Sequence, residues 1–295
     1  AHITRDLSCL GESKIVIIYI QSNYHEALIK RIRPYLRNGQ ILLLNPGYLS
    51  TAYVLKHCSD IDLTIVEAQS SFIDCRIMEP GIVKVLFRNV RNPLGIYPTS
   101  HSEKAEIMLS RLGFPFIYLS SVVEAALHNP NLIVHTVGAI MSIPRVEKTQ
   151  GDYYMYREVF TPSVWRILEE LDNEKMNVME KLGCKRVSYV DACKYRNTLD
   201  DSQEAKDIFF WYANLPNPLK GPTVVDSRFI SEDVPQGLVL LEALGLERKV
   251  ETPVCSALIS IASAALGRDL RLEGRTVKRL GENILERIFK GIEEE

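Results

Sequence analysis

The sequence contains no C-x-x-C pair and no histidine at metal-ligand spacing from a cysteine. Its six cysteines are scattered along the chain, at Cys9, Cys58, Cys75, Cys184, Cys193 and Cys255. Scattered cysteines without a metal or redox motif are typical of reduced thiols in cytosolic proteins. We therefore predict no metal site and a cytoplasmic location.

Neither sign of charge dominates the chain. Its 35 basic and 37 acidic residues give a formal net charge of −2, and they are spread along the sequence. This pattern provides no basic patch for nucleic acid or for an anionic membrane. No apolar run approaches the ~20 residues of a membrane span, and the N-terminus lacks a basic-then-apolar signal pattern. We therefore expect neither nucleic acid nor a membrane among the partners.

The chain has 295 residues, 46% hydrophobic and 24% charged, which is typical of a globular protein with one large or two ordinary domains. Four short apolar runs in the first 120 residues predict strands. They cover residues 14–20, 40–45, 62–68 and 82–87. Because they are apolar almost throughout, we expect strands that are covered on both faces of a parallel sheet. Helical spacing over residues 22–37 and 49–57 completes an α/β pattern.

The turn Asn45-Pro46-Gly47 follows the second predicted strand. In an open α/β sheet, turns at the carboxyl ends of strands line the ligand crevice, although a Pro-Gly pair also makes an ordinary tight turn. Both interpretations stay open. A dinucleotide-binding domain would also have a G-x-G-x-x-G turn after its first strand, because only glycine lets backbone amides approach a pyrophosphate there. This sequence has none, so either it binds no dinucleotide or it starts partway through such a domain.

After Ser120 the pattern changes to long helical periodicity. Ser121 and Glu124 have the spacing of a capping box at a helix start. Further helices are predicted from Thr161-Pro162 to Gly183, from Thr252-Pro253 to Gly267, and over residues 275–289. Proline at a helix start and glycine just past its end are typical of helix termini. We therefore predict an α/β domain over residues 1–120 and a helical domain over residues 121–295.

Three polar residues in the second half are candidates for chemistry. His135 lies in the apolar run of residues 131–140, where an imidazole is either a satisfied core group or a functional one. Asp233 and Arg228 lie in a Pro- and Gly-bounded segment, residues 221–237. Local sequence is equally consistent with Asp233 as a helix N-cap, and it favours Arg228 as a surface cation. The local pattern leaves these alternatives open.

Several stretches in order along the chain resemble the opine dehydrogenase family, which includes octopine and nopaline dehydrogenases. They are N-P-N-L-I-V-H at 129–135, G-D-Y-Y-M-Y-R-E at 151–158, T-P-S-V-W-R-I-L-E-E-L-D-N-E-K at 161–175, R-F-I-S-E-D-V-P-Q-G-L-V at 228–239, T-P-V-C-S-A-L-I at 252–259 and E-G-R-T-V-K-R-L-G at 273–281. N-P-G at 45–47 and E-A-Q-S-S-F-I-D-C-R at 67–76 fit the second half of the family's nucleotide domain. The resemblance thus covers nearly the whole chain.

The resemblance implies an α/β Rossmann-type domain, incomplete at its N-terminus, followed by an all-α opine dehydrogenase domain, with the active site between them. It implies NAD or NADP as cofactor, with Pro46, Gly47 and Glu67 in the cofactor-binding region. The implied substrates are small molecules, an amino acid and a 2-oxo acid, which are condensed and reduced by hydride. Whether the protein is a monomer or a homodimer stays open.

By the same resemblance, His135 is the catalytic acid and base, Asp233 pairs with it, and Arg228 holds a substrate carboxylate. These residue types suit the chemistry. Imidazole is the side chain whose unperturbed pKa of about 6.5 lies near neutral pH, and a neighbouring carboxylate fixes its tautomer. A guanidinium matches a carboxylate through two hydrogen bonds and does not deprotonate.

The sequence departs from the family at its start, because the glycine-rich dinucleotide turn with which members begin is absent. We expect the chain to be a fragment of a complete dehydrogenase. We also expect it to bind the cofactor poorly in this form. Two alternatives remain open. One is a non-catalytic relative that serves as a binding or assembly module, and the other is a related 2-oxo acid reductase.

Overall fold

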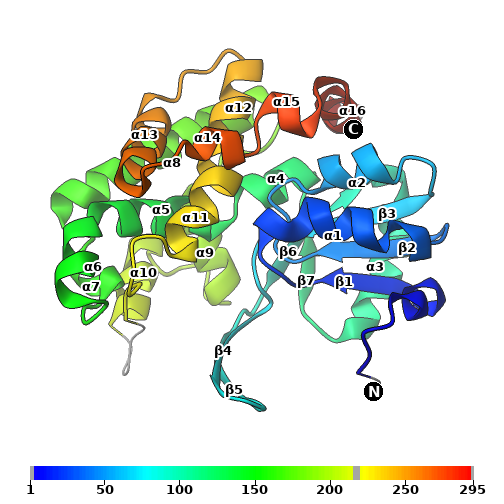
Figure 1. The fold of residues 1–295 in the computed structure, drawn as a ribbon, viewed down its shortest axis with the longest axis horizontal. Helices are drawn as coiled ribbons and strands as arrows, with labels where there is room; N and C mark the ends of the chain where they lie inside the picture. Colours follow the sequence, from blue (N-terminus) through cyan, green and yellow to red (C-terminus); the bar gives the residue numbers. More distant parts are fainter. Residues whose placement is uncertain (1–2, 215–219, 294–295) are drawn as a thin grey trace. The chain divides into compact units, whose positions relative to one another are not determined.

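The computed structural model describes residues 3–214 and 220–293 (Figure 1). The chain divides into two compact units. The first, the α/β unit, contains the residues up to Ser71, Asn92–Ala126 and the residues from Leu280 onward. The second, the helical unit, contains Phe72–Arg91 and Leu127–Arg279. The division into residues 1–120 and 121–295 stays a prediction.

The α/β unit is built on one five-stranded sheet in the order β1-β2-β3-β6-β7. Its strands are β1 (Ile15–Ile18), β2 (Gln40–Leu44), β3 (Leu63–Ala68), β6 (Asn92–Tyr97) and β7 (Phe116–Tyr118). The first three are parallel, and β6 runs antiparallel to β3. Every residue of β2 and β3 is buried. This confirms, for these two strands, the prediction that uniformly apolar runs form strands covered on both faces.

The helices of the α/β unit come from both ends of the chain. They are α1 (His25–Ile32), α2 (Thr51–His57), α3 (Ser102–Leu109), α4 (Val122–Leu127) and α16 (Glu282–Glu293). At the start of α4, Ser121 Oγ accepts from the Glu124 amide at 3.1 Å, as the capping pattern predicted. The predicted final helix over residues 275–289 is broken at Gly281, where φ is +98°. The part after the break, α16, lies against α2.

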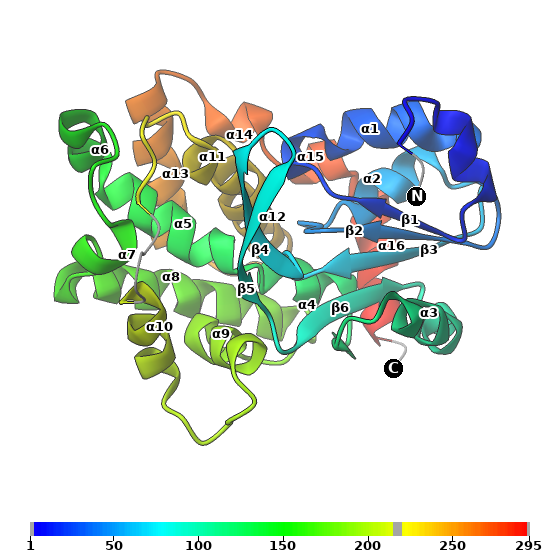
Figure 2. The ribbon, with the colours of Figure 1, turned by 90° about the horizontal axis from the view of Figure 1, so that it is seen from below.

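The fourth predicted strand does not lie in the parallel sheet. β5 (Ile82–Arg88) pairs antiparallel with β4 (Ile73–Glu79) in a separate two-stranded ribbon (Figure 2). Most of its apolar side chains are exposed, with Val83 56% and Val85 48% accessible. An apolar run does not by itself say which sheet a strand joins, so the expectation of a strand covered on both faces was wrong here.

The helical unit contains, after the ribbon, α5 to α14. Their bounds are α5 (Pro130–Met141), α6 (Ile143–Thr149), α7 (Met155–Glu158), α8 (Pro162–Lys181), α9 (Tyr189–Asn197), α10 (Ala205–Ala213), α11 (Arg228–Ser231), the π-helix η6 (Val234–Leu238), α12 (Val239–Glu247), α13 (Pro253–Leu266) and α14 (Leu270–Glu273). The short α15 (Val277–Leu280) follows them. The starts of α8 and α13 at Pro162 and Pro253 are confirmed, as is the left-handed glycine after α13, Gly267, with φ +66°.

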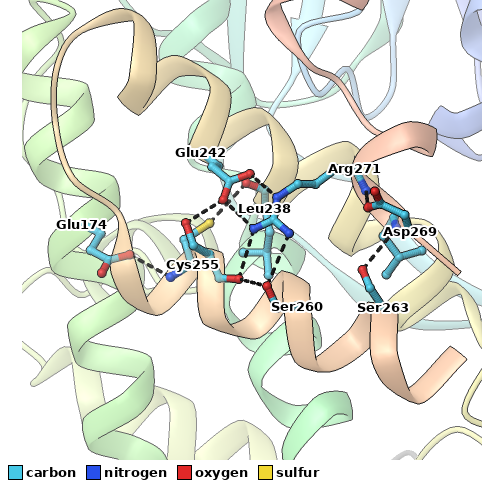
Figure 3. Close-up of polar contacts among 10 residues, drawn as sticks. Glu174, Leu238, Glu242, Cys255, Ser260, Ser263, Asp269 and Arg271 are labelled. Carbon is cyan, nitrogen blue, oxygen red and sulfur yellow. Dashed lines mark hydrogen bonds and ion pairs between the residues drawn. The ribbon is translucent and has the colours of Figure 1, made fainter. Parts of the chain in front are cut away.

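A polar network holds the last helices of this unit together (Figure 3). The Arg271 guanidinium on α14 donates to both carboxylate oxygens of Glu242 on α12, at 2.7 Å each. Glu174 on α8 accepts from the Val254 and Cys255 amides at 2.7 and 2.9 Å, and so caps α13. The Thr252 side chain makes no capping bond. A carboxylate from a distant helix therefore takes the place of a local side-chain cap.

Across the described parts of the chain, no single helix has both the length and the apolar character needed to cross a membrane. Helix α13 and Leu270–Leu280 meet the length and composition test only together, as a pair bent by 101°.

Candidate active site

His135 lies in the middle of α5, a helix that is buried almost along its whole length. The helix begins where the Asn129 side chain accepts from the Asn131 amide at 3.0 Å, with Pro130 in its first turn. Both features stabilise a helix start, because they satisfy or remove amides that lack a partner. His135 itself is 9% exposed. The helix therefore presents a fixed, largely desolvated imidazole.

Asp233 occupies the N-cap position of the π-helix η6 but does not act as a cap. Its side chain makes no capping hydrogen bond, and Oδ2 lies 2.9 Å from Nδ1 of His135. The carboxylate is almost completely buried, at 1% exposure. The carboxylate therefore contacts a distant side chain in place of capping the helix, and the functional role of Asp233 stays a prediction. π-Helical turns are rare and occur frequently at functional sites.

The hydrogen bond to Asp233 defines how the imidazole can exchange a proton. When the carboxylate carries its charge it only accepts, and Nδ1 then carries the hydrogen and donates it. In the neutral ring Nε2 is then an unprotonated nitrogen, and in the imidazolium it is a donor. Within residues 3–214 and 220–293, Nε2 of His135 has no hydrogen-bond partner. The arrangement can accept and return a proton at this one atom.

Phe229, which the sequence interpretation missed, stacks on His135. The two ring centroids are 4.0 Å apart and the planes are inclined by 26°. Phe229 lies on α11, and this short helix packs against both α5 and η6. Its position directly after Arg228 in the R-F-I-S-E-D stretch is the one signal in the sequence that could have drawn attention to it.

Arg228 begins α11, next to Phe229 in the chain. Its side chain is 50% exposed, and Nε lies 3.7 Å from Oε2 of the buried Glu232 one turn further on. Among the described residues, no hydrogen bond, ion pair or ring contact joins Arg228 to His135. The structure therefore brings His135 and Asp233 into contact, and leaves Arg228 as a half-exposed cation on the helix that carries the stacked ring.

The residues expected in the cofactor region lie at the carboxyl ends of β2 and β3 in the α/β unit. Glu67 is fully buried and accepts from the Leu49 amide at 2.8 Å and from both the amide and the hydroxyl of Thr51 at 2.7 Å. A Cβ at Gly47 would lie 2.0 Å from Oε2 of Glu67. Only glycine therefore fits at position 47, beside this carboxylate. The carboxylate in turn stabilises the turn that contains Pro46 and Gly47 through its hydrogen bonds to Leu49 and Thr51.

Asn45, at the start of the same turn, has a buried side-chain amide. It is 1% exposed, and neither Nδ2 nor Oδ1 has a hydrogen-bond partner in the described parts of the chain. A buried polar group without a partner costs about 1–3 kcal/mol. Ligands of open α/β sheets bind outside the carboxyl ends of the strands, so a polar group of a nucleotide fits this position.

Comparison with known proteins identifies the family. A family model described as NAD/NADP octopine/nopaline dehydrogenase, alpha-helical domain, matches residues 118–266. The chain belongs to the octopine/nopaline dehydrogenase family. An opine dehydrogenase from Arthrobacter sp. (strain 1C) is 26% identical over 95% of this chain and 78% of its own length.

Solved structures of octopine dehydrogenase have the same fold. One, in complex with NADH and agmatine, superposes with a TM-score of 0.74, at 16% identity over 98% of this chain and 81% of that one. Another, with NADH and pyruvate, gives a TM-score of 0.68 at 18% identity over 98% and 80% of the two chains. The predicted Rossmann-type α/β domain followed by a helical opine dehydrogenase domain is confirmed. As a member of the octopine/nopaline dehydrogenase family, the protein is an oxidoreductase that uses NAD or NADP and acts on CH–NH donors.

Proposed function

We propose that the protein condenses an amino acid with a 2-oxo acid and reduces the resulting imine to a secondary amine. The observation that carries this proposal is the 2.9 Å contact between the buried Asp233 carboxylate and Nδ1 of His135. A binding module without catalysis would have no need of a buried proton donor and acceptor. The substrate classes are supported by the octopine dehydrogenase structures, which hold L-arginine in one case and pyruvate in another.

His135 is the acid and base in this proposal. Attack of the amine on the oxo acid carbonyl and loss of water both require proton transfers, and Nε2 is the atom of His135 that is not engaged by Asp233. Asp233 orients the ring and stabilises the imidazolium that forms when Nε2 takes up a proton. General acid and base catalysis of this kind contributes typically ~10²–10⁴ in rate.

Arg228 binds the carboxylate of the oxo acid. Its guanidinium is half-exposed on α11, the helix that packs against α5, so it is available to a small anion near His135. A planar guanidinium donates two parallel hydrogen bonds to a carboxylate and keeps its charge at any pH of interest. It therefore orients the oxo acid without taking part in proton transfer.

The α/β unit is the cofactor-binding part. NADH or NADPH, when bound, supplies the hydride that reduces the imine carbon. The Asn45 amide is the group with unmet hydrogen-bonding capacity at the carboxyl end of β2, and it fits a polar part of the nucleotide. Pro46 and Gly47 form the turn beside it, and Glu67 keeps that turn in shape through its bonds to Leu49 and Thr51.

The test is an assay of the whole protein with panels of amino acids and 2-oxo acids. Oxidation of NADH or NADPH should require both substrates, and mass spectrometry should find one secondary amine formed per hydride consumed. His135→Ala should abolish turnover while melting as the wild type does. Consumption of the nucleotide with a 2-oxo acid alone would replace this proposal by simple oxo acid reduction.

A further inference from the structure

The hydrogen bond to Asp233 fixes one edge of the His135 ring but does not fix its plane. A single hydrogen bond at Nδ1 tolerates a range of angles, and the second torsion of a histidine side chain has broad energy minima. Tilting of the ring within this range would change the direction in which Nε2 points. Some further contact must hold the ring if Nε2 is to point in one direction.

The stacked Phe229 ring supplies such a contact. Its centroid lies 4.0 Å from that of the imidazole, with only 26° between the planes. At this separation the two faces touch, so tilting the imidazole would either open a gap or produce a clash. One edge of His135 is therefore held by Asp233 and one face by Phe229.

Phe229 also packs against the core of the helical unit. It packs against a buried cluster formed by Val146, Tyr153, Met155 and Val159. Tyr153 in that cluster is 1% exposed, and its hydroxyl is hydrogen-bonded to Ser142 Oγ at 2.9 Å. A Cβ at Gly221 would lie 2.2 Å from the Tyr153 ring, so the segment leading toward α11 also packs tightly on the cluster. Phe229 thus connects a buried core cluster to the imidazole.

We propose that Phe229 is a positioning residue, which fixes the plane of the His135 imidazole and so directs Nε2 at the reacting atoms. Its catalytic consequence rests on the function proposed above. Because Phe229 acts through His135, its removal should slow the chemical step and leave the binding of the oxo acid to Arg228 almost unchanged. The loss should therefore fall on kcat rather than on KM.

The first test compares three variants of the whole protein. Phe229→Leu, which keeps an apolar group but removes the ring, should lower kcat about tenfold and change the oxo acid KM by less than about twofold. Phe229→Tyr keeps the ring and should retain kcat within about threefold. The matched control is Phe210→Leu, because Phe210 is also partly exposed and lies 5.4 Å from the Trp165 ring, in another part of the helical unit. It should leave both constants unchanged.

The second test reads the ring contact itself and needs no turnover. In NMR spectra, the His135 ring protons of the wild type should be shifted upfield by the Phe229 ring current, with assignment from a His135→Gln spectrum. Phe229→Leu should remove the shift, Phe229→Tyr should keep it, and Phe210→Leu should not affect it. Phe229→Met, which is also apolar and lacks a ring, replaces Phe229→Leu if the latter does not fold.

The two tests separate the failure of this inference from failure of the proposed function. If no pair of substrates is reduced but the upfield shift is lost in Phe229→Leu, the proposed reaction is wrong and the positioning contact stands. If the imine is reduced but Phe229→Leu keeps the wild-type kcat, or loses activity through KM alone, Phe229 does not position His135. An NMR spectrum of His135 that is the same with and without the ring would also overturn the inference.

Discussion

The contact between Asp233 and His135 allows the most direct test of the site. Asp233→Asn removes the negative charge and keeps the shape of the side chain. The amide retains one oxygen, so Nδ1–H of His135 still has an acceptor at the 2.9 Å position. A hydrogen bond to a charged group contributes about 1.5–3 kcal/mol and one between neutral groups about 0.5–1.5 kcal/mol. The charge alone is therefore worth about 1–1.5 kcal/mol.

This difference acts when the imidazole carries a proton, which the proposed mechanism requires during turnover. Since each 1.36 kcal/mol corresponds to about tenfold in rate, Asp233→Asn should lower kcat about tenfold. Asp233→Leu removes the acceptor as well as the charge, so the ring loses its fixed tautomer. Its kcat should fall toward the ~10²–10⁴-fold loss that is typical of removing a general acid or base.

The assay is the loss of NADH or NADPH absorbance with both substrates varied, so that kcat and each KM are obtained separately. Asp226→Asn is the matched control, because Asp226 is 53% exposed on the same segment and pairs with Arg268 at 2.9 Å. It should behave as the wild type. Melting temperatures of all variants separate lost activity from lost folding. Wild-type kcat in both Asp233 variants, or a loss confined to KM, would refute the role assigned to Asp233.

Four further predictions concern Arg228, the partly buried Glu242 and the buried Glu174 and Glu67. Arg228→Lys should raise the oxo acid KM about tenfold and leave kcat nearly unchanged, because a point charge cannot make the paired hydrogen bonds. The same oxo acid KM in the variant and the wild type would show that Arg228 is only a surface charge. The pKa of Glu242 is lowered, since the bonds from Arg271 and Ser256 outweigh the burial that by itself raises it. The stability that Glu242 provides is thus present above its ordinary pKa and is lost as the pH falls through the lowered value. Glu242→Gln should lower the free energy of unfolding at pH 7 by about 1–3 kcal/mol, and in urea titrations this free energy should depend less on acid pH than in the wild type. Glu174→Ala should cost about 0.5–2 kcal/mol by uncapping α13, measured by thermal melting against the exposed control Glu180→Ala. Glu67→Gln should lower the free energy of unfolding by about 1–3 kcal/mol, because an amide cannot accept from all three donors of the turn. It should also weaken nucleotide binding, as measured by calorimetry.

The strands and the long helices were predictable where the local signal was unambiguous. Uniformly apolar runs led to β2 and β3, and the Thr-Pro and glycine signals led to α8 and α13. The same kind of run failed for β5, because its partner is a neighbouring strand across the Pro80-Gly81 turn, and not the main sheet. An apolar segment shows that a strand is favoured, but its place in a sheet depends on pairing over distance.

The site shows the same limit. Local sequence left Asp233 either as a cap or as a functional group, and only the three-dimensional contact across 98 residues of chain shows which group its carboxylate meets. The family resemblance named His135, Asp233 and Arg228, but it did not point to Phe229 or to the buried amide of Asn45. Stacking and unmet hydrogen bonds are relations between residues, and the residue types alone do not contain them.

The return of α16 to the α/β unit has a consequence for synthesis. Leu285, Ile288 and Phe289 of this helix are buried, at 0%, 1% and 5% exposure, and the helix lies against α2. A ribosome releases the strands of the α/β unit first, yet this face of α2 stays uncovered until residues 282–293 have emerged. The helical unit, whose residues lie between, is then complete before the unit that precedes it. A nascent chain stalled before residue 282 should accordingly show protease protection in the helical unit and susceptibility around α2.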